Sequence, residues 1–181
     1  MKTESEIYLR LESCNFNIST DTRKYIKGSV FFAIKGENFD GNKFVKEALS
    51  KGAVAVVTQN KSYKGKNIFV VKNTLKTLQD IATKYRDTFK IPIIAIGGSN
   101  GKTTSKELVS SVLRKEYKVH STSGSFNNHL GVPLSILSMK KDTEIGVFEI
   151  GANHPNEHTE LLNILKPTFV VVTNNGLDHL S

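Results

Sequence analysis

Apolar and polar residues alternate along this chain in short blocks, and the blocks predict strands and helices in turn. In the first half, apolar runs typical of strands lie at Val30–Ile34, Val54–Val57 and Ile68–Val71. Apolar residues at helical spacing predict helices over Asn42–Lys51 and Thr74–Phe89. The Ile91-Pro92 pair ends the second pattern, because a residue that precedes proline is disfavoured in the helical conformation. We therefore expect one domain over residues 1–90 and another over residues 91–181.

The second half repeats the order strand, then helix, and this order defines its fold class. The predicted strands are Ile93–Ile96, Tyr117–Ser121, Ile145–Ile150 and Phe169–Thr173. The predicted helices are Lys102–Glu116, Pro133–Met139 and Pro155–Leu165. The expected buried stripe of the first helix consists of Leu108, Val109, Val112 and Leu113. Strands that alternate with helices pair in parallel, so we expect an α/β fold, a small N-terminal α/β domain followed by a parallel-sheet domain.

Composition narrows the class of protein. The chain has 181 residues, of which 38% are hydrophobic, and this fraction is too high for a disordered chain. No apolar run approaches the ~18–20 residues that a bilayer span needs, and the first ten residues lack the apolar core of a secretory signal. The single cysteine, Cys14, cannot form an internal disulfide, which fits a reducing compartment. We expect a cytoplasmic protein with no membrane insertion.

The net charge of +8 is confined to the first half of the chain. Residues 1–90 carry 17 Lys and Arg against 9 Asp and Glu, whereas residues 91–181 carry 8 of each kind. A basic half favours an anionic partner, and charge alone leaves nucleic acid, an acidic membrane, a phosphorylated small molecule or merely a solvated surface open. Because Phe31, Phe32 and Phe39 stand in core-like or turn contexts rather than among lysines, we expect no nucleic-acid binding.

The most specific motif joins an apolar strand to an amphipathic helix. It is the run Gly98-Ser99-Asn100-Gly101-Lys102-Thr103-Thr104, in the context of a phosphate-binding P-loop. Its glycines allow a tight turn that points N–H groups at phosphate oxygens, and the helix N-terminus adds partial positive charge. We expect Lys102 to reach the β- and γ-phosphates of ATP and the Thr103 hydroxyl to bind Mg²⁺. The strict motif has glycine where this chain has Ile96.

Further candidates follow the other predicted strands at the same sheet edge. Ligands of parallel sheets bind outside the carboxyl ends of the strands. Glu149 ends one strand, and its charge is unusual in a strand buried on both faces, so we expect it to hold Mg²⁺. Thr173-Asn174 end another strand, and His179 follows a few residues later. The sequence therefore predicts that Glu149 and His179 converge on the bound phosphates.

These motifs and several other short runs resemble the Mur ligases, the ATP-dependent amide-forming enzymes of peptidoglycan precursor synthesis. The runs are Asp21–Arg23, Gly28–Ala33, Phe39–Asn42, Gly98–Glu107, Phe126–Leu134, Glu149–Pro155 and Thr173-Asn174. Within the family, Asn127–Leu134 and the Glu-x-Gly-Ala-Asn-His run are most similar to the members that use D-alanyl-D-alanine. The family's shorter Gly-x-Asn-Gly-Lys-Thr loop also accommodates Ile96.

The resemblance implies a role for each matched residue. It implies a uridine-diphosphate site in the first domain at Asp21, Thr22, Arg23, Asp40, Gly41 and Asn42. Asn42 stands where the family more often has histidine. The implied neighbours of the sugar-peptide substrate are Asn127 and Asn128. In the ATPase domain the implied catalytic residues are Lys102, Glu149 and His179, of which Glu149 and His179 join Thr103 as metal ligands.

The implied reaction is a two-step acyl activation that no enzyme nucleophile has to assist. The terminal carboxylate of UDP-N-acetylmuramoyl-tripeptide attacks the γ-phosphate of ATP, and the amine of D-alanyl-D-alanine then displaces phosphate from the acyl phosphate. The family's carbamylated lysine and its last domain would fall beyond Ser181. We therefore expect a monomeric chain that carries the uridine-nucleotide domain and half of the ATPase domain, and that is inactive alone.

Three alternatives stay open at this point. A sibling ligase that adds the third residue of the peptide would share the ATPase motifs, and so would a folylpolyglutamate synthetase. A stand-alone UDP-sugar-binding module, with an ATPase half that only regulates or scaffolds, belongs to a different functional class. Separate titrations with a UDP-muramoyl peptide and with Mg-ATP distinguish the module from the ligases.

Overall fold

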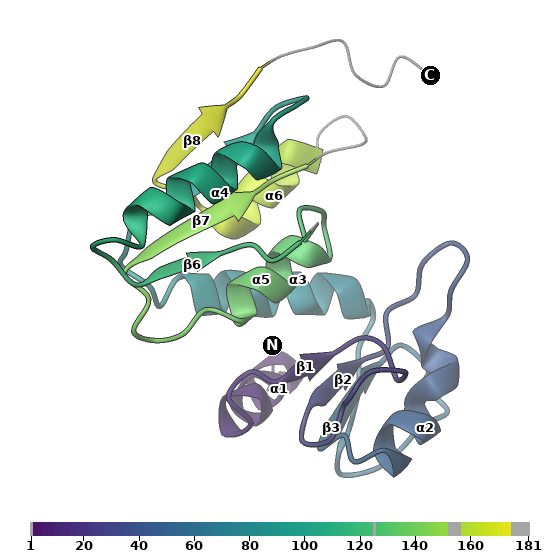
Figure 1. The fold of residues 1–181 in the computed structure, drawn as a ribbon. Coiled ribbons are helices and arrows are strands. Elements are labelled where there is room, and N and C mark those ends of the chain that lie inside the picture. The colour runs from purple at the N-terminus through teal and green to yellow at the C-terminus, as the bar shows by residue number, and fades with distance from the viewer. Residues whose placement is uncertain (1, 125, 152–156, 175–181) are drawn as a thin grey trace. The chain divides into compact units, whose positions relative to one another are not determined.

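The computed structural model describes residues 2–124, 126–151 and 157–174. The chain forms two compact units, Met1–Ile81 and Ala82–Ser181, each with its own sheet (Figure 1). The division falls inside the helix α3 (Thr74–Arg86), upstream of the domain boundary expected at Ile91-Pro92, which stays a prediction. None of the helices in the described ranges is long and apolar enough to cross a membrane.

The first unit is built on a four-stranded parallel sheet with the strand order β1-β2-β3-β4. The strands are β1 (Ile18–Ser19), β2 (Val30–Phe32), β3 (Ala55–Thr58) and β4 (Ile68–Val70). The helices are α1 (Lys2–Ser13), the 3₁₀ helix η1 (Gly41–Phe44), α2 (Val45–Ser50) and the beginning of α3. The sequence pattern predicted all but α1 and β1. Among its many charged residues α1 buries Ile7 and Leu11 one turn apart, and β1 is too short to show a period.

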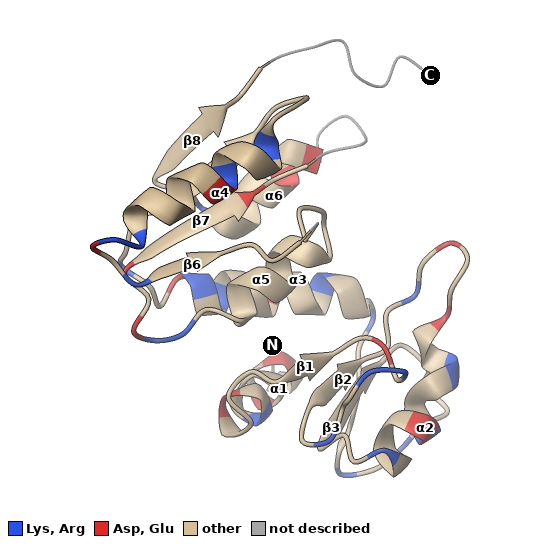
Figure 2. Ribbon diagram, in the orientation of Figure 1, with Lys and Arg blue, Asp and Glu red and all other residues tan. Residues whose placement is uncertain are grey.

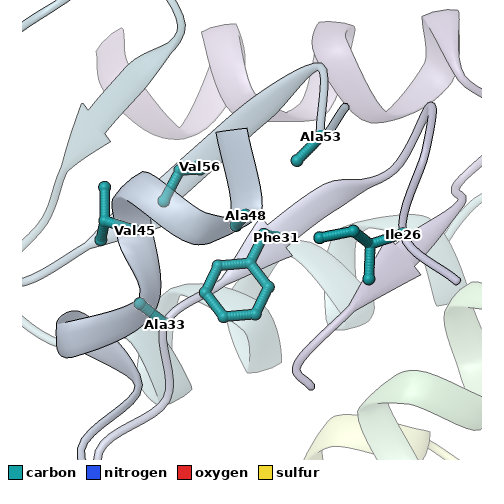
Figure 3. Close-up of a cluster of buried hydrophobic side chains, with 7 residues drawn as sticks. All are labelled: Ile26, Phe31, Ala33, Val45, Ala48, Ala53 and Val56. Atoms are coloured by element: carbon teal, nitrogen blue, oxygen red, sulfur yellow. The ribbon is translucent and has the colours of Figure 1, made fainter. Parts of the chain in front are cut away.

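The core of the first unit lies on both faces of β2 and β3. One face carries the cluster of Ile26, Phe31, Ala33, Val45, Ala48, Ala53 and Val56, in which α2 packs on the sheet (Figure 3). The alternate residues Val30, Phe32, Ala55 and Val57 point to the other face and are also fully buried. A strand buried on both faces has no polar side, so it reads as a continuous apolar run, and this explains why the sequence predicted these strands.

The second unit has a parallel sheet with the strand order β6-β7-β5-β8, as expected for its α/β fold. The strands are β5 (Ile93–Gly97), β6 (Val119–Ser121), β7 (Ile145–Glu149) and β8 (Phe169–Val172). The helices are α4 (Lys102–Leu113), α5 (Gly131–Leu137), α6 (Glu157–Leu165) and the end of α3. Across the ladder, Ile96 of β5 aligns with Glu149 of β7, and Gly97 aligns with Val172 of β8. The carboxyl ends of three strands therefore meet at one edge.

The helices α4 and α5 lie on opposite faces of the second sheet. The helix α4 packs on the face that carries Ile96, Ile145 and Val147, against which Val109 and Leu113 are partly buried. On the opposite face, Nε2 of His120 in β6 lies 3.2 Å from Oγ of Ser135 in α5. The predicted buried stripe of α4 is half wrong, because Leu108 and Val112 are 62% and 69% exposed. The buried face follows Lys106, Val109, Ser110 and Leu113 at helical spacing instead.

Candidate functional site

The P-loop of the second unit connects the end of β5 to the start of α4 in four residues. Gly98 has φ +126° and Gly101 has φ +80°, backbone conformations in which a side chain would be strained. Gly101 is the N-cap of α4, so the helix begins at Lys102. The first N–H groups of a helix have no acceptor within it, and they carry its partial positive charge. The loop therefore presents backbone donors at the sheet edge, as the motif predicted.

Lys102 places its ammonium group over this loop. Its Nζ donates hydrogen bonds to the carbonyl oxygens of Gly98 at 2.7 Å and of Ser99 at 2.8 Å. These acceptors are neutral, so the ammonium charge is available to an anion that binds above the loop. Thr104, the next residue but one, is exposed at the same helix start.

Glu149 is the one charged residue within the strands that the structure describes, and it stands at the tip of β7 (Figure 2). Its side chain is only 2% exposed. The Thr103 hydroxyl donates to Oε2 at 2.8 Å, and Nδ2 of Asn127 donates to Oε1 at 2.8 Å. Both carboxylate oxygens therefore have hydrogen-bond partners, which burial of a carboxylate requires. Thr103 and Glu149, chosen from separate motifs, are brought into contact.

The segment after β6 holds Asn127 and the end of β7 in place. The carbonyl of Asn127 accepts the Gly151 N–H at 2.8 Å, and a Cβ at Gly151 would lie 3.0 Å from Nδ2 of Asn127. The hydroxyl of Thr122 accepts the N–H of Glu149 at 3.2 Å. Nζ of Lys106, a 1% exposed residue of α4, donates to the Thr122 carbonyl at 2.8 Å. One network thus links α4, the end of β6 and the end of β7.

The donor set suits a hard divalent cation. Thr103 and Glu149 offer a hydroxyl and a carboxylate oxygen already 2.8 Å apart, and Mg²⁺ prefers oxygen ligands of this kind. Within the described ranges no group of three or more His, Cys, Asp and Glu side chains is close enough to hold a metal ion. The third predicted ligand, His179, lies outside the described residues. Two protein ligands are compatible with Mg²⁺, which usually keeps several waters.

Asn127 and Asn128, both predicted to lie near the sugar-peptide substrate, make different contacts. Asn127 faces Glu149, as described above. Oδ1 of Asn128 accepts the N–H groups of Leu130 at 3.1 Å and Gly131 at 2.8 Å, which satisfies backbone donors at the start of α5. The structure therefore places Asn127 in the site and gives the side chain of Asn128 a role in the turn before α5. Their predicted contact with a sugar-peptide substrate stays a prediction.

In the first unit, the loop Asp21–Arg23 follows β1 and is organised around a local ion pair. Arg23 Nη2 lies 2.8 Å from Asp21 Oδ2, and the Arg23 side chain is 87% exposed. Hydrogen bonds from the Arg23 side chain, with its backbone N–H, lower the pKa of Asp21 to about 2. The Thr22 carbonyl accepts a hydrogen bond from Nζ of Lys51 at 2.8 Å, which ties the loop to the end of α2.

The second predicted loop, Asp40–Asn42, is tied to the end of β3. Oδ1 of Asn42 accepts hydrogen bonds from the Thr58 hydroxyl at 2.7 Å and the Gln59 N–H at 2.9 Å. Its Nδ2 donates to Asp40 Oδ1 at 2.7 Å, and this bond lowers the pKa of Asp40. A Cβ at Gly41 would lie 2.6 Å from the Ile34 carbonyl oxygen, so only glycine fits there. Asn42, 8% exposed, is thus a structural link within the unit.

Four residues of the second site were not assigned a role from the sequence. They are Lys106, Thr122, Thr173 and Asn174, all of which hydrogen-bond to the loops around Glu149 and Lys102. Thr173 and Asn174 carry a signal, because they follow a predicted strand at the functional edge. Lys106 and Thr122 carry no signal, since their partners lie 16 and 27 residues away in the chain.

Two family models match the chain in succession. One, described as the Mur ligase family catalytic domain, matches residues 17–96, and the other, the Mur ligase middle domain, matches residues 96–181. The chain belongs to the Mur ligase family. The P-loop and Glu149 lie within the match to the middle domain.

Individual Mur ligases are also similar in sequence to this chain. A UDP-N-acetylmuramoyl-tripeptide–D-alanyl-D-alanine ligase from Synechocystis is 41% identical over 91% of this chain and 37% of the relative. One of the same name from Bacillus subtilis is 39% identical over 90% of this chain and 36% of the relative. The crystal structure of MurF ligase from Thermotoga maritima with ADP matches with a TM-score of 0.84 and 35% identity, over 91% of this chain and 39% of that one. The chain thus spans little more than a third of the length of these relatives.

Proposed function

We propose that this protein is an ATP-dependent ligase that joins D-alanyl-D-alanine to UDP-N-acetylmuramoyl-tripeptide. The observation that carries the proposal is the Thr103–Glu149 contact at 2.8 Å, which joins the phosphate-binding loop to a buried carboxylate at the same sheet edge. The relatives that bear this activity in their names, at 39% to 41% identity, support the choice of substrates. The ADP complex of the Thermotoga relative supports ATP as the phosphoryl donor.

In the proposed first step, an oxygen of the substrate carboxylate forms a bond to the γ-phosphorus of ATP. The bond between that phosphorus and the β–γ bridging oxygen breaks, and ADP leaves. Negative charge on the transferred phosphoryl group is met by Lys102 and by the N–H groups at the start of α4. In the second step, the amine of D-alanyl-D-alanine attacks the acyl carbon, inorganic phosphate leaves, and the nitrogen loses a proton.

The residues around Glu149 hold its carboxylate in a fixed orientation. Thr103 and Asn127 orient the two carboxylate oxygens of Glu149, and the same oxygens with the Thr103 hydroxyl would hold Mg²⁺. When bound, the metal supplies positive charge to the phosphate oxygens. Oriented groups of this kind need no rearrangement as charge develops, which is the main source of electrostatic catalysis. His179 is proposed as a further metal ligand.

The first unit is proposed to bind the uridine-diphosphate end of the substrate, through its loops Asp21–Arg23 and Asp40–Asn42. Its excess of lysine and arginine over acidic residues favours an anionic nucleotide. Figure 2 shows these basic residues spread over helices and loops of the unit. We further propose that the enzyme is monomeric and cytoplasmic, acts in peptidoglycan synthesis, and affects cell shape and division.

The ligase activity is tested with the whole polypeptide that carries these residues, by measuring the inorganic phosphate formed from ATP. We expect release to require ATP, UDP-N-acetylmuramoyl-tripeptide and D-alanyl-D-alanine together, and to stop when any of them is omitted. Release with UDP-N-acetylmuramoyl-dipeptide and a diamino acid, and none with the tripeptide and D-alanyl-D-alanine, would instead favour the sibling ligase that adds the third residue.

The stand-alone binding module is tested on the 181-residue chain by two separate calorimetric titrations. We expect both Mg-ATP and the UDP-muramoyl peptide to bind, because each unit keeps its own loops at its own sheet edge. Binding of the UDP-muramoyl peptide without any binding of Mg-ATP would contradict the ligase and favour the module.

A further inference from the structure

Two residues directly after β8 contact the phosphate-binding loop from the side opposite Glu149 in the strand order. The Thr173 hydroxyl donates to the Asn100 carbonyl at 2.5 Å, and it also lies 3.3 Å from the Gly97 carbonyl. Oδ1 of Asn174 accepts the Asn100 N–H at 2.9 Å, and the Asn174 carbonyl accepts the Ser99 N–H at 3.3 Å. Both backbone polar groups of Asn100 are therefore bonded to a segment more than seventy residues away.

This segment is itself anchored on the sheet. Val172 pairs with Gly97 at the end of the β5–β8 ladder, and the Thr173 N–H donates to the Gly97 carbonyl at 3.0 Å. The ladder thus continues for one residue beyond β8 and delivers Thr173 and Asn174 to the loop in a set position. The segment is thus held by backbone pairing of β8, an edge strand with exposed side chains, to the largely buried strand β5. A segment held in this way can orient a loop, whereas a free segment would move with it.

Gly98 shows how closely the segment approaches. A Cβ at this position would overlap the Thr173 hydroxyl oxygen and would lie 3.0 Å from the Asn174 carbonyl oxygen. The hydroxyl belongs to a side chain and can rotate away, whereas the Asn174 carbonyl oxygen and the Thr173 nitrogen, both at 3.0 Å, are backbone atoms that would have to yield. A side chain at Gly98 is therefore crowded by this segment and strained by its φ of +126°. The positive φ and the crowding by the segment after β8 both favour glycine at this position.

We propose that Thr173 and Asn174 are positioning residues that set the phosphate-binding loop before nucleotide binds. We call the hydrogen bonds from Thr173 and Asn174 to Ser99 and Asn100 the bracket. The N–H groups of Ser99 and Asn100 are used in the bracket. Those of Lys102, Thr103 and Thr104 lack acceptors within α4 and remain for the phosphates. A loop that is already ordered loses less conformational entropy on binding, so the bracket raises nucleotide affinity. The affinity part of this inference rests on the proposed function.

The test uses the 181-residue chain with Asn174→Ala, Thr173→Val and the conservative Thr173→Ser. Amide hydrogen exchange at Asn100, followed by NMR without nucleotide, reports the bracket directly. We expect about tenfold faster exchange in Asn174→Ala, in line with the loss of one hydrogen bond. Calorimetry with Mg-ATP should show about five- to tenfold weaker binding in Asn174→Ala and Thr173→Val. Thr173→Ser keeps the hydroxyl and should match the unchanged chain in both measurements.

The possible results separate the bracket from the proposed function. Unchanged exchange at Asn100 in Asn174→Ala would overturn the bracket, and so would equally faster exchange at Ile96 and Val109, which would indicate general loosening of the unit. Faster exchange confined to the loop, in a chain that binds no Mg-ATP, would support the bracket and contradict the proposed function. Unchanged Mg-ATP affinity in both variants would overturn the positioning role.

Discussion

The two candidate sites hold their charged groups in different ways. In the second unit, Glu149 is 2% exposed, and its partners Thr103 and Asn127 lie 46 and 22 residues away in the chain. In the first unit, Asp21 pairs with Arg23 two residues further on, and the Arg23 side chain is 87% exposed. One carboxylate depends on the fold for its partners, whereas the other finds its partner within its own turn.

This difference has an energetic consequence. A buried carboxylate without partners is costly, so removing or changing one member of the Glu149 group affects all of it. An exposed ion pair is screened by water and contributes little to stability. The first site can therefore change its charged residues with little effect on folding, while the second cannot.

Glu149→Gln should have the largest effect and should act on function. The amide keeps the size of the side chain but removes the charge, and it presents an N–H₂ group to one of two donors, Thr103 or Asn127. We expect a loss of roughly 10²–10³-fold in ATP-dependent turnover, comparable to the loss of an oriented electrostatic group. Steady-state phosphate release by the whole polypeptide that carries these residues measures it, with Glu160→Gln, at an exposed residue of α6, as the matched control. Equal activity of the two variants would contradict the role of Glu149.

His120 is a titratable residue on the face of the second sheet opposite α4, where it contacts Ser135 of α5. Burial lowers the pKa of His120 to about 4, below its ordinary value of 6.5. The unfolded chain therefore binds the proton more readily between these values, and stability should fall as the pH is lowered from 6.5 towards 4. The expected loss is about 3 kcal/mol at most, from the size of the shift.

Denaturant unfolding of the second unit between pH 7 and pH 4 measures this loss. The variant His120→Gln cannot titrate, so its unfolding free energy should lack this part of the pH dependence. The same slope in both chains would assign it to other groups and contradict the prediction.

Asn42→Ala should destabilise the first unit without any ligand. It leaves the Thr58 hydroxyl and the Gln59 N–H without their acceptor, and it removes a donor to Asp40. We expect a loss of about 1–3 kcal/mol in the free energy of unfolding, the usual cost of buried polar groups left unsatisfied. Thermal or denaturant unfolding checks it. A stable variant with weakened binding of the UDP-muramoyl peptide would instead show that Asn42 acts on the ligand.

Arg23→Ala should have the smallest effect on stability. The ion pair with Asp21 is exposed, and exposed pairs contribute little. Because Arg23 lowers the pKa of Asp21, the small contribution is present above pH 4 and is lost as the pH falls towards about 2. Unfolding at pH 7 should be unchanged, while a proposed uridine-diphosphate contact predicts weaker binding of that ligand. Marked destabilisation at pH 7 would contradict the contrast between the two sites.

Local patterns in the sequence determined much of this protein. Continuous apolar runs predicted β2, β3, β5 and β7, because parallel strands buried on both faces carry no polar side. The glycines and Lys102 predicted the loop between β5 and α4, since a P-loop lies within a few consecutive residues. Glu149 was recognised because a charge at the end of an apolar strand is unusual. In each case the physical cause lies within a few residues of the feature.

The tertiary structure alone decided what the polar side chains do. It separated Asn127, which contacts Glu149, from its neighbour Asn128, which supports the start of α5. It turned Leu108 and Val112 outward and buried Lys106 in their place, because the sheet, and not the periodicity, selects the covered face of α4. It also brought Thr173 and Asn174 to the phosphate-binding loop. These outcomes depend on partners far apart in the chain, and only the packing of strands and helices sets those distances.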